Sequence, residues 1–318
     1  MRVFVAGATG AIGVPAVRQL VAAGHDVVGL TRTPGKTALV RALGAEPAVA
    51  DALDPAGLRA AVVAAHPAVV VHLLTALPKN GPTRAADLRA TEIVRARGTR
   101  NLRAAAVAAG ARRLVVEGFV GVYGVGNLGA RPLAEDELPA RAEVMPRMQM
   151  AVESMRAFEQ SVVGPAGHAS EIEGVVLRLG YIYGPEVGST QFMARLLRRR
   201  MFPLPGGGRG VVPWVHVEDA AAAFVAALTA GAPGAIYNVV DDEPVALRAY
   251  AEEFAGLLGA PPPWSVPLWL ARLLAPYAAA GLSGQLVLAN ARAKRDLGWV
   301  PRYPTYRDGL RATVPVAD

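Results

Sequence analysis

The chain contains no cysteine among its 318 residues, which excludes disulfides, thiol catalysis and cysteine-ligated metal sites. Its five histidines lack the short spacings of metal ligands, so we expect no metal centre. No apolar run reaches the roughly 18 residues that a membrane span needs. The longest candidate, Trp264 to Leu274, is interrupted by Pro267 and Arg272. We therefore expect a protein without a membrane segment.

Charge is also scarce, at 19% of residues against 53% hydrophobic, and this balance excludes a disordered chain. The net charge of +7 has one dense cluster, Arg195 and Arg198–Arg200, at the end of a predicted helix. No nucleic-acid-binding motif accompanies the cluster, so we expect no nucleic-acid partner. No signal peptide precedes the first predicted strand. We expect a cytoplasmic monomer or homodimer that acts on a small molecule.

The most informative segment is a glycine-rich turn near the start of the sequence. An apolar strand over Met1–Ala6 leads into Gly7-Ala-Thr-Gly-Ala-Ile-Gly13, and an apolar helix pattern follows over Val14–Ala23. In this context the three glycines allow a sharp turn, a close approach of a pyrophosphate and tight helix packing. The helix N-terminus then faces the phosphates with free N–H groups. The pattern predicts a dinucleotide site formed by Gly7, Thr9, Gly10, Ala11, Ile12 and Gly13.

Strands and helices alternate along the first half of the chain, which predicts an α/β fold with a doubly wound parallel sheet. One long helix is expected over Ala85–Ala109 and another over Met148–Val163. The second half is Pro-rich and less regular, which indicates a smaller lobe at the ligand-binding edge of the sheet. We expect a Rossmann domain from residues 1–179 plus 211–240, and a substrate-binding lobe from 180–210 plus 241–318.

Several further motifs follow in a characteristic order and spacing. With the glycine turn, the sequence resembles the extended short-chain dehydrogenase/reductase family, which contains NAD(P)-dependent epimerases and dehydratases. The resemblance covers almost the whole chain. The motifs that carry it are Gly98-Thr-Arg-Asn-Leu102, Val122-Tyr-Gly124, Arg178-Leu-Gly-Tyr-Ile-Tyr-Gly-Pro185, Trp214-Val-His-Val-Glu-Asp219, Tyr237-Asn-Val239 and Ala293-Lys-Arg-Asp-Leu-Gly-Trp-Val-Pro301.

The resemblance also implies a catalytic Ser or Thr, a Tyr-x-x-x-Lys pair and an Asn, and this chain departs from all of them. No Tyr occurs between Tyr123 and Tyr181, and no Lys between Lys79 and Lys294. Neither Phe nor Met can donate a proton, and Gln carries no charge that would lower a neighbour's pKa. The usual proton relay is therefore absent. The positions of the lost residues are Arg95, Phe119, Met145 and Gln149. Two phenols expected near the cleft, Tyr123 and Tyr183, are weak catalytic candidates or structural residues, and so are Thr75 and Lys79.

The cofactor preference depends on the end of the second strand. NAD-preferring members of the family place an Asp there, whereas this chain has Thr31, with Arg32 and Lys36 just beyond it. A guanidinium can pair with a 2′-phosphate, so we expect NADPH/NADP. The alternative for Arg32 and Lys36 is that they are solvated loop cations without a ligand. The alternative for Asp51 is that it caps a helix. By resemblance, further cofactor contacts are expected from Asp51, Ala52, Leu73, Leu74, Thr75, Gly180, Tyr181 and Ile182.

The expected substrate site is apolar and aromatic. Val212 stands where nucleotide-sugar enzymes of this family carry an Arg that grips the diphosphate, so a sugar nucleotide is not expected. A large apolar pocket suits a bulky hydrophobic ketone or enone. The alternatives are a non-catalytic NADPH-binding sensor or scaffold, and an isomerase. His216 is expected to pack the two lobes together, and Trp264 and Trp269 to be either core or pocket. The residues expected at the substrate are Phe119, Val120, Tyr123, Met145, Met148, Tyr181 and Trp214.

Overall fold

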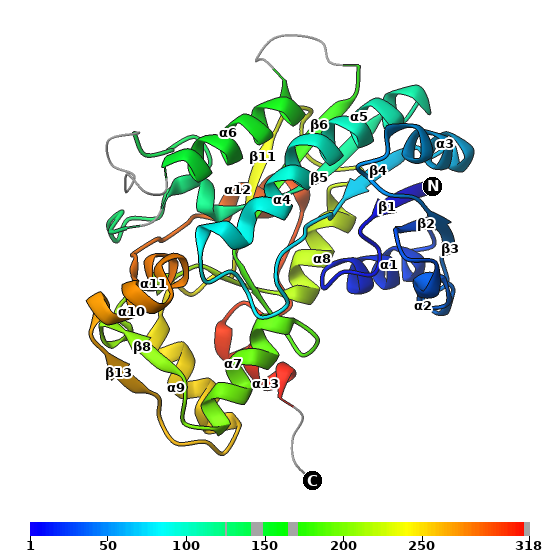
Figure 1. Ribbon diagram of the computed structural model, residues 1–318. Coiled ribbons are helices and arrows are strands. Elements are labelled where there is room, and N and C mark those ends of the chain that lie inside the picture. The colour runs from blue at the N-terminus through cyan, green and yellow to red at the C-terminus, as the bar shows by residue number, and fades with distance from the viewer. Residues whose placement is uncertain (125, 141–148, 165–170, 315–318) are drawn as a thin grey trace.

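A computed structural model describes residues 1–124, 126–140, 149–164 and 171–314. Its centre is a seven-stranded sheet in the order β11-β6-β5-β4-β1-β2-β3, and every pair in it is parallel (Figure 1). The strand order reverses between β1 and β4, which is the hallmark of a doubly wound fold. The strands are β1 (Arg2–Ala6), β2 (Asp26–Thr31), β3 (Glu46–Val49), β4 (Val69–His72), β5 (Arg113–Phe119), β6 (Glu173–Leu179) and β11 (Ile236–Val239).

Helices cover both faces of this sheet, as continuous apolar strands require. On one face Val3, Val71 and Val115 belong to a core with α1 and α8. On the other face Phe4, Val70 and Val116 belong to a core with α3, α5 and α6. The alternation follows from the two-residue period of a strand. The helices around the sheet are α1 (Gly13–Ala22), α2 (Thr37–Ala42), α3 (Pro55–Ala65), α5 (Thr99–Ala108), α6 (Gln149–Val163), α8 (Val217–Ala226) and α12 (Ala291–Leu297).

The single helix predicted over Ala85–Ala109 is wrong in detail. A 3₁₀ turn and α4 (Arg89–Ile93) are followed by a π-helical turn over Val94–Gly98, and only then by α5. Thr91 and Thr99 are both buried. In an uninterrupted α-helix, residues eight apart point about 80° away from each other. The wider π turn brings both threonines to the inner face, a phase change that apolar periodicity does not reveal.

The second lobe lies to one side of the sheet, at the lower left of Figure 1. Its core gathers around Tyr250, Phe254 and Leu197. Trp264 and Trp269 are exposed, so neither belongs to that core. None of the helices in the described part of the chain has the length and apolar character that crossing a membrane requires. The lobe and its junction contain β7 (Tyr181–Tyr183), α7 (Gly188–Arg198), β8 (Pro203–Pro205), β9 (Val211–Val212), β10 (Trp214–His216), β12 (Val245–Ala246), α9 (Leu247–Leu257), β13 (Trp264–Val266), α10 (Leu268–Leu274), α11 (Pro276–Ser283) and α13 (Tyr306–Thr313).

Candidate active site

The glycine turn joins β1 to α1, and its backbone is packed too closely for side chains at two positions. Gly7 has φ +96°, and a Cβ there would lie 2.6 Å from the carbonyl oxygen of Leu73. A Cβ on Gly13 would overlap the carbonyl oxygen of Gly7. The amide of Gly10 donates to that same oxygen at 3.0 Å. Thr9, Gly10 and Ala11 form the accessible tip of the turn.

The N-terminus of α1 is left free for an anion. Ile12 occupies the N-cap position without a side-chain hydrogen bond, and the first turn carries no acidic residue. The amide of Val14 donates to the Gly10 carbonyl oxygen and Pro15 has no N–H, so in the first turn the amide of Gly13 is the donor left next to the glycine turn among the described contacts. The helix dipole also favours negative charge there. A Cβ added to Gly10 would have only the Gly7 carbonyl oxygen near it, at 3.3 Å. These residues fit the pyrophosphate of a dinucleotide.

Beyond β2, two cations face solvent. The side chains of Arg32 and Lys36 are exposed, and neither has a hydrogen-bond or ion-pair partner within the described ranges. Thr31 is buried, and its hydroxyl oxygen accepts from the amide of Thr33 at 3.2 Å. The carboxylate of Asp51 accepts from the amide of Leu53. The helix cap is supplied by the neighbouring Asp54, while Ala52 is buried under the loop.

The other predicted cofactor residues lie at the carboxyl ends of β4 and β6. Leu73 is buried against the glycine turn, Leu74 is half-buried and Thr75 is exposed. Gly180 lies against the backbone of Pro213, because a Cβ there would be 2.7 Å from its carbonyl oxygen. Tyr181 and Ile182 follow on β7 and are half-buried. The strand order places these residues on the same edge of the sheet as the glycine turn.

A pocket opens at this edge, between β5, β7 and α11. The rings of Phe119 and Tyr181 meet edge to face, with 5.3 Å between their centroids. Two glycines form part of the wall because side chains would not fit. A Cβ on Gly281 would lie 2.5 Å from the Tyr181 hydroxyl oxygen, and one on Gly284 would lie 2.7 Å from the Gly126 carbonyl oxygen. The lining residues are Phe119, Gly121, Gly124, Gly126, Met155, Tyr181, Pro213, Tyr277, Gly281, Gly284 and Leu286.

Of the predicted substrate residues, Phe119 and Tyr181 line this pocket. Val120 and Tyr123 are fully buried beside it, in a small core of their own. Trp214 stacks on Tyr250, with 4.0 Å between ring centroids, and touches the pocket only through Tyr181. Sequence reasoning missed the contributions of Met155, Tyr277 and Leu286, which come from segments without a recognisable motif. Met145 and Met148 lie outside the described residues, and Gln149 begins α6.

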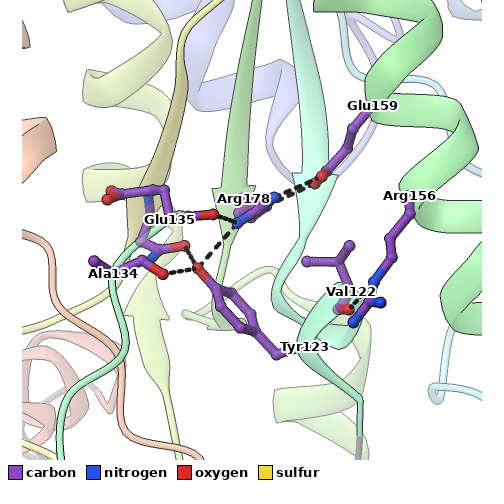
Figure 2. A network of polar contacts seen from close by, with 8 residues as sticks. Val122, Tyr123, Ala134, Glu135, Arg156, Glu159 and Arg178 are labelled. Atoms are coloured by element: carbon purple, nitrogen blue, oxygen red, sulfur yellow. Dashed lines mark hydrogen bonds and ion pairs between the residues drawn. The ribbon is translucent and has the colours of Figure 1, made fainter. Parts of the chain in front are cut away.

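Tyr123 belongs to a buried polar network rather than to the pocket surface (Figure 2). Its hydroxyl has two acceptors within reach of its one hydrogen, the Ala134 carbonyl oxygen at 3.1 Å and the Asn238 amide oxygen at 3.0 Å, and it accepts from Arg178 at 3.0 Å. Arg178 also donates two 2.8 Å hydrogen bonds to the carboxylate of Glu159. The network ties the end of β5 to β6, α6 and β11. The sequence signal was present, since Arg178 stands inside an otherwise apolar strand.

The phenol of Tyr183 and the imidazole of His216 pack at the junction of the two lobes. The Tyr183 hydroxyl is buried against α13, where it has no hydrogen-bond partner in the described structure. The Nδ1 atom of His216 accepts from the amide of Glu218 and so caps α8. The ring of His216 lies between Tyr183 and Tyr303. Burial lowers the pKa of His216 to about 4, so the ring is neutral at pH 7.

Arg95 acts electrostatically on three ionisable side chains, one of which, Tyr277, lines the pocket. Its charge acts on His72, Glu117 and Tyr277, which come from β4, β5 and α11. Burial raises the pKa of Glu117 to about 7, and Arg95 opposes that rise. Burial, followed by the charge of Arg95, lowers the pKa of His72 to about 4. The Nε2 atom of His72 lies 2.7 Å from the Thr99 hydroxyl oxygen.

Comparisons with known proteins agree with this architecture. A model of the NAD dependent epimerase/dehydratase family matches residues 3–240. A 3-diazoavenalumate denitrifying reductase from a Streptomyces species is 39% identical over 316 residues, covering 98% of this chain and 99% of its own. A Stigmatella aurantiaca ketoreductase, named for a 4-hydroxy-2-methyl-3-oxo-4-farnesyl-3,4-dihydroquinoline-1-oxide, is 27% identical and covers 98% of this chain and 95% of its own.

Among solved structures, the UDP-glucose 4-epimerase of Thermus thermophilus in complex with NAD superimposes with a TM-score of 0.76. It is 26% identical and covers 99% of this chain and 98% of its own. The seven-stranded sheet, the glycine turn and the ordered family motifs thus occur together along one chain. The protein belongs to the NAD-dependent epimerase/dehydratase family, the extended short-chain dehydrogenases/reductases.

Proposed function

We propose that this chain is an NADPH-dependent reductase of secondary metabolism whose substrate is an aryl diazo compound, from which it removes nitrogen by reduction. The observation that carries the proposal is the 39% identity, along almost the whole chain, to a denitrifying reductase of a diazo acid. The aromatic pocket around Phe119 and Tyr181 suits a flat ring. Its position at the sheet edge beside the glycine turn suits a substrate of a nicotinamide cofactor.

This chemistry also accounts for the missing proton relay. One hydride, which is a proton with two electrons, joins the terminal nitrogen of an aryl diazonium ion. The neutral aryldiazene that forms then loses N₂, and a hydrogen joins the aryl carbon. No oxyanion develops, and the net reaction takes up no proton, because the hydrogen that leaves nitrogen balances the one that joins carbon. Phe119 at the usual Ser position, and the absence of any Tyr between Tyr123 and Tyr181, are compatible with such a reaction.

The cofactor, when bound, supplies the hydride. The turn from Gly7 to Gly13 would hold its pyrophosphate, and Arg32 with Lys36 would pair with a 2′-phosphate. Both cations are exposed, and within the described residues nothing else engages them. Leu73 and Gly180 border the edge where the reacting end would lie. The contribution of the protein to the chemistry is mainly position and charge.

A second candidate function is reduction of a bulky hydrophobic ketone or enone. The 27% identity to a ketoreductase favours it. Ketone reduction creates an alkoxide that must take up a proton, and positioned proton transfer typically contributes about 10²–10⁴-fold to the rate. Without the Tyr–Lys pair, such a substrate would have to be protonated by water or by a hydroxyl of its own. For this reason, ketone reduction is the second candidate function and diazo reduction the first.

The test is incubation of the protein with NADPH and a panel of arenediazonium salts and polycyclic ketones. We expect N₂ and the dediazotised arene, with one NADPH oxidised for each N₂ released. The Gly10→Val variant measures the background reaction of NADPH with the diazonium ion. Reduction of the ketones alone would replace the proposal by the second candidate. Binding of NADPH without turnover of either class would indicate a sensor, a scaffold or an isomerase.

A further inference from the structure

Glu117 is an acidic residue in an otherwise apolar strand segment. It lies near the carboxyl end of β5, two residues before Phe119. Side chains two apart on a strand leave the same face of the sheet, so Glu117 shares its face with the ring that lines the pocket. The side chain is half-buried. It has no hydrogen-bond or ion-pair partner among the described residues, although a half-buried carboxylate costs free energy when it is left unpaired.

Glu117 is linked to the pocket through Phe119 on the same strand and through a charge that it shares with a lining residue. Arg95 lies on the π turn and influences Glu117, His72 and Tyr277 at the same time. Tyr277 lines the pocket itself. Yet Arg95 forms no ion pair with Glu117, since no nitrogen–oxygen distance within 4.0 Å joins them. The carboxylate therefore lies near a cation that favours its charged form, while no donor among the described residues forms a hydrogen bond or ion pair with its oxygens.

We propose that Glu117 is the counter-ion of a cationic acceptor group, and that it thereby selects diazonium ions over ketones. The inference rests on the proposed function, because it assigns to that site a residue that recognises the charge of the substrate. A carboxylate attracts a cation and repels an anion strongly in a partly desolvated site. Glu117 thus acts on the reacting group itself.

The movement of charge during the reaction supports this assignment. In the proposed reaction the acceptor group is a cation before it is reduced and a neutral aryldiazene afterwards. A carboxylate beside that group favours binding of the cation. Ketone reduction instead places a negative alkoxide at the same point, and the carboxylate opposes it. Glu117 would therefore slow a ketoreductase and assist a diazonium reductase.

Ionisation of Glu117 makes the charge recognition dependent on pH. Its raised pKa means that a substantial fraction is protonated at pH 6 and little is protonated at pH 8. The groups around it do not change charge over that range: Arg95 stays cationic, His72 stays neutral, and the burial-raised pKa of Tyr277 keeps its phenol neutral. Affinity for a cation should therefore increase with pH through about 7.

The experiment measures binding without cofactor or turnover. Phenyltrimethylammonium, a flat aromatic cation that cannot be reduced, is titrated into the protein by calorimetry, with neutral N,N-dimethylaniline as the comparison. We expect Glu117→Gln to weaken binding of the cation at pH 8 by on the order of tenfold, and to leave the neutral ligand unchanged. Glu92→Gln is the matched control, since Glu92 is a carboxylate whose charge acts on Tyr277 but not on Glu117. It should change neither affinity.

Equal affinity of wild type and Glu117→Gln for the cation at pH 8 would overturn the inference. Should that variant fail to fold, the wild-type protein still decides the question. Its preference for the cation over the neutral ligand must increase from pH 6 to pH 8, and a flat or falling preference would refute the role of Glu117. A protein that binds the cation through Glu117 but reduces no diazonium salt would refute the proposed function alone.

Discussion

Arg178 and Glu159 form a bidentate ion pair inside the protein, with both hydrogen bonds at 2.8 Å and at most 4% of either side chain exposed. The pair joins β6 to α6 and continues through Tyr123 to the loop around Ala134 (Figure 2). Because Phe119 at the end of β5 and Gly124 next to Tyr123 line the pocket, the pair supports the shape of the site as well as the fold. It is also the point at which a single substitution should cost most.

Glu159→Gln should destabilise the protein by roughly 3–5 kcal/mol, because the guanidinium of Arg178 would remain buried without a counter-charge. The measurement is urea unfolding. Glu252→Gln provides the control, since its pair with Arg248 is exposed and worth about 0.3–0.5 kcal/mol. A loss for Glu159→Gln no larger than that of the control would mean that the network does not stabilise the fold.

Arg32→Ala should weaken NADPH binding by about tenfold or more and leave NADH binding nearly unchanged. The reason is that a charge-assisted hydrogen bond contributes roughly 1.5–3 kcal/mol, and only NADPH carries the 2′-phosphate. Calorimetric titration with both cofactors measures the difference. Arg59→Ala removes from α3 another exposed guanidinium, one without a partner in the part of the chain that the structure describes, and should affect neither. Equal losses of NADPH and NADH in Arg32→Ala would contradict the assignment.

Gly10→Val should abolish cofactor binding in a protein that remains folded. The branched side chain would stand at the accessible tip of the turn, where a pyrophosphate approaches the backbone. Fluorescence titration with NADPH tests binding, and circular dichroism tests the fold. Gly256→Val on α9, where a Cβ meets no other group within 4 Å, is the control for the substitution itself. Retained NADPH affinity in Gly10→Val would show that the phosphates bind elsewhere.

Gln149→Asn and Met145→Leu should each lower single-turnover oxidation of NADPH by less than about tenfold, because neither residue is expected to transfer a proton. Installing Met145→Tyr together with Gln149→Lys should not raise the rate, since Phe119 still occupies the third position. The rates are measured with a diazonium substrate once one is found. A thousandfold loss in a folded, cofactor-binding Gln149→Asn variant would establish direct participation of Gln149.

Asp241→Asn should stabilise the protein at pH 8 and make its stability less dependent on pH. Burial, with the nearby charges of Asp242, Glu243 and Asp219, raises the pKa of Asp241 to about 8. The folded state therefore binds more protons than the unfolded state between about pH 4 and pH 8, so stability falls as pH rises through this window. We expect a gain of roughly 1–3 kcal/mol at pH 8.

The comparison is chemical unfolding at pH 5 and pH 8. Asp242→Asn is the control, since Asp242 is more exposed and pairs with Lys294, and its removal should give no such gain. An unchanged pH dependence in Asp241→Asn would show that Asp241 is ionised in the folded protein across the whole range.

The sheet and the glycine turn could be predicted because their signals are local. The apolar runs at Val3–Ala6 and Val69–His72, and the spacing of Gly7, Gly10 and Gly13, depend on neighbouring residues alone. The pocket could be predicted only in part. Phe119 and Tyr181 belong to recognisable motifs. Tyr277 reaches the pocket through the packing of α11, and no periodic pattern in the sequence indicates that packing. Which ionisable groups meet at Arg95 likewise depends on the π turn, and this turn was missed.

Two walls of the pocket have consequences for how its substrate range can change. Where Gly281 meets Tyr181 and Gly284 meets Gly126, there is no space for even a methyl group. Laboratory evolution toward other acceptors is therefore confined to the remaining side chains. Phe119, Met155 and Leu286 also line the pocket, and saturation of these three codons would vary its shape without touching the two glycine walls.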